Sequence, residues 1–119
     1  MKHKDRLERP SRLLRHVVLF AFRDSASPED IREIEEAFCA LPDRIDEVHG
    51  FEWGTDVSAE SLSQGYSHCF LVTFLSERGR DRYLPHPAHQ EFVAALEPHL
   101  EKVLVIDYWA TQTRSSEVI

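Results

Sequence analysis

Two segments of the chain are apolar at nearly every position, and they constrain the fold more than any other feature of the sequence. They are residues 17–22 and residues 103–106. An antiparallel strand with one face in water alternates apolar and polar residues, and these segments do not. A sheet that contains them must therefore be covered on both faces.

The expected elements follow one another in the order β-α-β-β-α-β. Strands are expected at residues 14–22, 48–55, 66–75 and 103–109, and helices at residues 28–41, 77–83 and 87–100. Ser27 and Pro28 form a strong start for the first helix, as its cap and its first residue. The order predicts an α+β, ferredoxin-like fold with one four-stranded antiparallel sheet and the helices on one face.

The second face of this sheet needs a partner, because two helices can cover only one face. The loop at residues 56–65 is too short and too polar to cover the other. An uncovered face would expose an apolar patch larger than monomeric proteins usually show. We therefore expect a homodimer through the sheet face, in which two sheets pack together as a dimeric α/β barrel.

Composition and charge exclude several classes of partner. The chain has 119 residues, which suits one domain, and its net charge of −7 argues against binding to nucleic acid. It has no apolar run of membrane-spanning length and no secretory signal pattern, so we expect a cytoplasmic protein that does not bind membranes. Cys39 and Cys69 show neither metal-ligand nor disulfide spacing, and we expect no metal site.

The two ends of the chain differ from its body. Residues 1–15 hold six Lys or Arg and two Asp or Glu, although the whole chain is acidic. We expect residues 1–13 to form a flexible basic arm and residues 111–119 a flexible tail. The folded domain is then expected at residues 14–110.

The motif Tyr-Leu-Pro-His-Pro-Ala-His at residues 83–89 is the strongest candidate site. Its first proline must end one helix and its second suits the first position of the next, which makes His86 the N-cap. His89 then lies at the third helical position, where the helix dipole disfavours a charged imidazole. A neutral His can act as a base, and Tyr83 can donate to an oxygen that gains charge. The simpler interpretation is a structural corner between two helices.

Other polar and aromatic side chains have a structural interpretation. His68 is expected to be a core or interface histidine, and the two tryptophans are expected to pack at the ends of the barrel. Asp107 is interpreted as an edge hydrogen-bond partner. The spacing of the arginines in the short helix spreads them around it, which favours a solvated surface over an anion site. These arginines are Arg78, Arg80 and Arg82.

Five segments, taken together and in order, resemble the stress-responsive A/B barrel (Dabb) family. They are residues 16–24, 51–56, 65–68, 83–92 and 103–108. The resemblance covers residues 14–110 and implies a dimeric α+β barrel, in agreement with the argument from the strands. Most members have no established reaction. Similarity to a polyketide cyclase related to the family implies Tyr83 and His89 as catalytic residues, and His16 and His86 as ligand-binding or supporting residues.

With this resemblance we expect a pocket between sheet and helices that binds a small organic ligand, and such chemistry requires no metal or flavin. Some relatives bind a divalent cation through main-chain carbonyls after the first helix, a region that matches residues 39–45 here. Pro42 breaks the usual pattern of that region, so we expect no metal and no cofactor. In an aldol-type ring closure, neutral His89 would take a proton from carbon and Tyr83 would hold the enolate oxygen. His16 and His86 would fix the tautomer of His89.

Whether the protein is an enzyme stays open at this point. One alternative is a non-catalytic, dimeric stress or scaffold protein with a filled interior. Another is a cofactor-free monooxygenase of the dimeric α+β barrel type. A cavity of about 300 Å³ or more, lined by Tyr83 and His89, would favour ligand binding.

Overall fold

The structure is a computed structural model that describes residues 12–111. The expected arm and tail therefore lie almost wholly outside the described residues. The elements are β1 (Leu14–Phe22), α2 (Pro28–Cys39), α3 (Leu41–Arg44), β2 (Gly50–Thr55), β3 (His68–Phe74), α4 (Glu77–Tyr83), α5 (Pro87–Leu96), a short 3-10 helix (Glu97–His99) and β4 (Leu100–Trp109).

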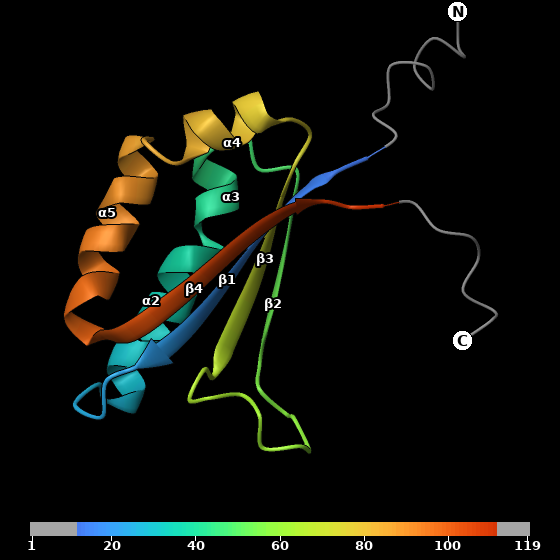
Figure 1. Cartoon of the computed structure of the whole chain (residues 1–119). Helices are drawn as coiled ribbons and strands as arrows, with labels where there is room; N and C mark the ends of the chain where they lie inside the picture. Colours follow the sequence, from blue (N-terminus) through green and yellow to red (C-terminus); the bar gives the residue numbers. More distant parts are fainter. Residues whose placement is uncertain (1–11, 112–119) are drawn as a thin grey trace, which may run out of the picture.

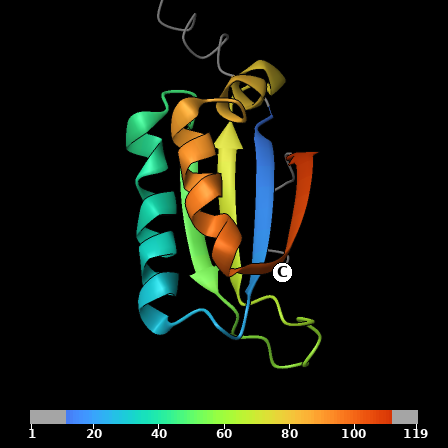
Figure 2. The same cartoon turned by 90° about the vertical axis from the view of Figure 1, so that its left-hand side faces the viewer.

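The four strands form one antiparallel sheet in the order β2-β3-β1-β4. α2 and α5 lie side by side on one face of this sheet (Figure 2). α4 lies at one end of it, next to the start of β1 and the end of β4 (Figure 1). The ferredoxin-like fold predicted from the sequence is confirmed.

Element boundaries differ from the prediction mainly where prolines interrupt helices. The helix expected at residues 28–41 is divided into α2 and α3, because Pro42 has no N–H with which to continue the helical hydrogen bonds. Pro98 has the same effect on α5, whose last turn becomes the short 3-10 helix. β4 therefore begins at Leu100, three residues earlier than expected, and pairs there with Phe22.

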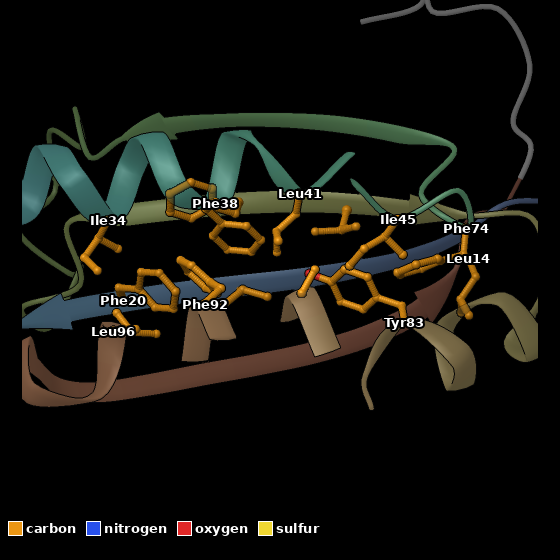
Figure 3. Close-up of a cluster of buried hydrophobic side chains, with 14 residues drawn as sticks. Leu14, Phe20, Ile34, Phe38, Leu41, Ile45, Phe74, Tyr83, Phe92 and Leu96 are labelled. Carbon is orange, nitrogen blue, oxygen red and sulfur yellow. The ribbon is translucent and has the colours of Figure 1, made fainter. Parts of the chain in front are cut away.

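The core lies between the sheet and the helices, and aromatic rings fill its middle (Figure 3). The ring of Phe38 in α2 stacks on Phe70 of β3, with 4.3 Å between the centroids. Phe92 of α5 lies 4.5 Å from Phe38. Aromatic pairs of this kind contribute about 0.5–1.5 kcal/mol beyond the burial of their area. These contacts hold both long helices against the centre of the sheet.

The face of the sheet opposite the helices is also apolar, as the strand pattern predicts. We call it the outer face and define it by the side chains that alternate with the core residues, Val17, Leu19, Leu71, Leu104 and Ile106. Leu104 is 40% exposed and Ile106 is 53% exposed in the single chain. No described helix lies over this face (Figure 2).

Candidate active site

A cavity of about 440 Å³ lies between β1, β4 and α5. α5 lies over the centre of the sheet, so the inward side chains of the edge strand β4, Val103 and Val105, stay half exposed and form one wall. Phe20, Phe92 and Leu96 extend the apolar lining. Most of the polar lining lies near the motif, namely His16, Tyr83, His89 and Asp107, and Glu97 of the 3-10 helix adds a further carboxylate.

The Pro-His-Pro corner sets the direction of α5. α4 ends at Tyr83 and α5 begins at Pro87, as the sequence predicts. The Nδ1 atom of His86 accepts a hydrogen bond of 3.0 Å from the N–H of Ala88, which makes His86 the side-chain cap of the helix. His86 does not line the cavity. His86 therefore stabilises the start of α5, and α5 in turn positions His89.

The imidazole of His89 is held by the main chain. Its Nδ1 lies 2.9 Å from the carbonyl oxygen of Leu84, and a carbonyl only accepts, so Nδ1 donates and Nε2 keeps the free lone pair of the neutral ring. The expectation that His16 and His86 fix this tautomer is wrong, because the Leu84 carbonyl does so.

The neutral form of His89 is favoured by its surroundings. Burial is the largest cause that lowers its pKa, and positive charge on His16 or His86 lowers it further, whereas the bond to the Leu84 carbonyl raises it. From the sequence, we expected the helix dipole to be the reason that His89 stays neutral. The structure gives burial as the main reason.

Tyr83 carries a buried hydroxyl for which the described residues offer no hydrogen-bond partner. The phenol ring lies 5.0 Å from the ring of Phe74 and 4.5 Å from that of His89, between centroids, within the helix–sheet layer (Figure 3). Burial raises the pKa of Tyr83, so the phenol stays protonated and can donate. An unpaired buried hydroxyl costs about 1–3 kcal/mol, which an acceptor in the cavity would offset.

A second imidazole, that of His16, also lies next to Tyr83, with 6.0 Å between their ring centroids. Its Nδ1 is 2.7 Å from Oδ1 of Asp107, and the other carboxylate oxygen accepts from Nη1 of Arg80 at 3.0 Å. Because a carboxylate only accepts, Nδ1 of His16 donates to it and Nε2 is the free nitrogen. Two imidazoles with free Nε2 atoms thus border one phenol.

Sequence reasoning did not include Asp107 and Arg80 in the site. Asp107 was expected to be an edge hydrogen-bond partner, and only the strand register shows that it lies directly across from His16. The assignment of the α4 arginines to a solvated surface agrees with the exposure of Arg78 and Arg82. It is wrong for Arg80, whose side chain is 21% exposed and bonds to Asp107.

His68 is a core histidine, as the sequence predicts. Its Nε2 lies 2.7 Å from a carboxylate oxygen of Glu35, and its Nδ1 lies 2.8 Å from the hydroxyl of Ser67. The ring also stacks on the indole of Trp53, 6.0 Å away. Both of its nitrogens are engaged, so His68 has no free nitrogen to offer a ligand.

Residues 12–111 contain neither a metal-binding cluster of side chains nor a membrane-spanning helix. Within this range, no three His, Cys, Asp or Glu side chains gather in a way that can hold a metal ion. No helix within the same range is long and apolar enough to cross a membrane.

Comparisons with known families and proteins identify the family to which this chain belongs. The family model Dabb, Stress responsive A/B Barrel Domain, matches residues 14–110. This chain belongs to the Dabb family. It is 45% identical over 98 residues to stress-response A/B barrel domain-containing protein HS1 of Arabidopsis thaliana, covering 82% of this chain and 90% of that protein. It is 30% identical over 95 residues to olivetolic acid cyclase of Cannabis sativa, covering 80% and 94%.

Solved structures of other proteins share the fold of this Dabb protein. Hydroxynitrile lyase from Passiflora edulis is 26% identical, with a TM-score of 0.81 over 89% of this chain and 100% of that chain. A dimeric ferredoxin-like protein of unknown function from Jannaschia sp. CCS1 is 25% identical, with a TM-score of 0.71 over 81% and 97%. Different activities are named among these relatives, so membership of the family does not select one.

Proposed function

We propose that this Dabb protein binds a small organic carbonyl compound in the helix–sheet cavity and acts on it by acid–base chemistry without a cofactor. The observation that carries the proposal is the unpartnered hydroxyl of Tyr83, whose ring borders the imidazoles of both His16 and His89. A carbonyl oxygen would accept from this hydroxyl. The cavity of about 440 Å³ also lies within the usual size of small-molecule sites, about 300–1,000 Å³.

The proposed step is the removal of a proton from the carbon next to the carbonyl. The Nε2 lone pair of His89 takes the proton, the C–H electron pair forms the enolate, and the hydroxyl of Tyr83 donates to the enolate oxygen. The enolate carbon then attacks a second carbonyl of the same molecule, which forms a C–C bond and an alkoxide. The imidazolium of His89 returns the proton to that alkoxide. A positioned acid–base group typically contributes about 10²–10⁴-fold to such a rate.

The names of two relatives support this class of chemistry. A cyclase closes a ring, and a hydroxynitrile lyase cleaves a hydroxynitrile. In the second case a base takes the hydroxyl proton, the C–C bond breaks, and cyanide leaves with the electron pair. A neutral imidazole beside a phenol donor suits both directions of carbon–carbon chemistry at a carbonyl oxygen.

The test is deuterium exchange at the carbons next to the carbonyl in a panel of small ketones and β-keto esters, followed by proton NMR. We expect exchange above the buffer rate for the native chain and its loss in His89→Gln. His49→Gln is the matched control, because His49 is exposed and lies outside the cavity. An exchange rate that is equal in both variants, or no exchange with any compound, would contradict the proposal.

We also infer that two copies pair through the outer face. Two observations support a homodimer: the exposure of Leu104 and Ile106 on that face, and the dimeric state named for the Jannaschia relative. Ile106→Asp should give a monomer of 13.8 kDa in light scattering. Val93→Asp, at an exposed apolar residue of α5 on the opposite side of the sheet, should stay dimeric. A native chain that is monomeric at micromolar concentration would contradict this pairing.

A further inference from the structure

Arg80 differs from the other two arginines of its helix. Arg78 and Arg82 are exposed, whereas the guanidinium of Arg80 reaches β4 and donates from Nη1 to Oδ2 of Asp107 at 3.0 Å. The same guanidinium donates from Nε to Asp81 at 3.1 Å, which fixes its plane against α4. Arg80 therefore occupies a defined position between two carboxylates.

Asp107 divides its two oxygens between two donors. Oδ1 accepts from Nδ1 of His16, and Oδ2 accepts from Arg80. A carboxylate whose second oxygen is held by a guanidinium cannot turn freely, so the oxygen that faces His16 stays in place. The pair can thus hold the ring of His16 with Nδ1 as the donor.

We propose that Arg80 is a positioning residue for His16, because by sharing Asp107 it holds in place the carboxylate that fixes the imidazole in its Nδ1–H form. Arg80 touches neither the cavity nor a ligand in it. Its effect passes through Asp107 to the ring that borders Tyr83.

The charged and titratable groups that face His16 come from three elements. β4 supplies Asp107, α4 supplies Tyr83 and, behind Asp107, Arg80, and α5 supplies His89. β3 faces the ring with Val72 and Phe74, which do not titrate. Tyr83 is uncharged because burial raises its pKa. Asp107 is therefore the charged group that touches the ring, and Arg80 is the charged group paired with it.

The consequence for chemistry rests on the proposed function. With Nδ1 donating to Asp107, Nε2 of His16 keeps its lone pair in a ring that borders Tyr83. By holding this tautomer, Arg80 leaves an acceptor nitrogen of His16 available beside the cavity.

The test is the nitrogen NMR spectrum of the His16 ring, which reports its tautomer and needs no substrate. In the native chain we expect Nδ1 to carry the proton, and in Arg80→Met we expect a mixture of the two tautomers, because Asp107 is then free to turn away from the ring. Arg82→Met, on the same helix, should leave the tautomer unchanged, and Arg80→Lys should restore part of the native Nδ1–H population. A tautomer that does not change in folded Arg80→Met would overturn the proposal.

Two further measurements keep the test decisive. If Arg80→Met does not fold, Arg80→Leu replaces it, because it also removes the donor to Asp107. In an Asp107→Asn background, adding Arg80→Met should not change the His16 tautomer further, because the carboxylate that couples them is gone. A changed His16 tautomer in Arg80→Met, in a protein that exchanges no ketone protons, would keep this inference and remove the proposed function. The reverse result would remove this inference alone.

Discussion

Two buried histidines on neighbouring strands make the same carboxylate contact but differ in their second nitrogen. His16 pairs with Asp107 and His68 pairs with Glu35, both at 2.7 Å. The second nitrogen of His68 is bonded to Ser67. The second nitrogen of His16 belongs to a ring that lines the cavity. A buried histidine–carboxylate pair is therefore no sign of an active site by itself, and the free nitrogen beside a cavity is the informative feature.

The largest expected effect separates chemistry from packing. His89→Ala should reduce proton exchange of a bound ketone by about 10²–10⁴-fold, because the base is lost. It should change the free energy of unfolding little, because His89 borders a cavity. His68→Ala should leave the exchange rate per folded molecule within a few-fold. Exchange followed by proton NMR, beside urea unfolding of both variants, checks this, and equal losses of activity would undo the distinction.

The two carboxylate pairs should differ in stability when each histidine is removed. His68→Ala leaves Glu35 without its partner and removes the ring stacked on Trp53, so it should cost about 1–3 kcal/mol. His16→Ala should cost less, because Asp107 keeps its bond to Arg80. Urea unfolding curves measure both costs. A larger loss of unfolding free energy in His16→Ala than in His68→Ala would contradict this expectation.

Tyr83→Phe should be neutral or should stabilise the chain by up to about 1 kcal/mol, because it removes a buried hydroxyl that has no partner. The same change should weaken binding of a carbonyl ligand, since the donor is lost. Tyr66→Phe, at a half-buried ring under Lys102, is the control and should not affect binding. A clear loss of stability in Tyr83→Phe would mean that the hydroxyl is already satisfied without a ligand.

The smallest expected effect is a dependence of stability on pH. Burial lowers the pKa of His89 below its ordinary value of 6.5, so at and below that pH the unfolded chain binds a proton that the folded chain binds less well. Stability from this group is thus present above that value and decreases as the pH falls through it. His89→Gln should flatten the change in unfolding free energy between about pH 7.5 and about pH 5.5. An equally steep change in the variant would assign the slope to other groups.

Sequence predicts best the features whose determinants lie close together in the chain. The corner, with His86 as cap and His89 at the third position of α5, follows from two prolines within seven residues. The contact between His16 and Asp107 joins residues 91 positions apart, and it depends on the register of β1 against β4. No local pattern encodes that register, so the partner of His16 and the role of Arg80 behind it became visible only in the structure.

Two neighbouring residues of β4 face opposite sides of the sheet. Val105 faces the cavity, and Ile106, next to it, belongs to the outer face. Because successive side chains of a strand point to opposite faces, a substitution at one of these residues leaves the surface formed by the other unchanged. A lineage, or a designer, can therefore vary the shape of the cavity wall while retaining the proposed contact between copies. One edge strand would thus allow the proposed ligand preference and the proposed assembly to change independently of each other.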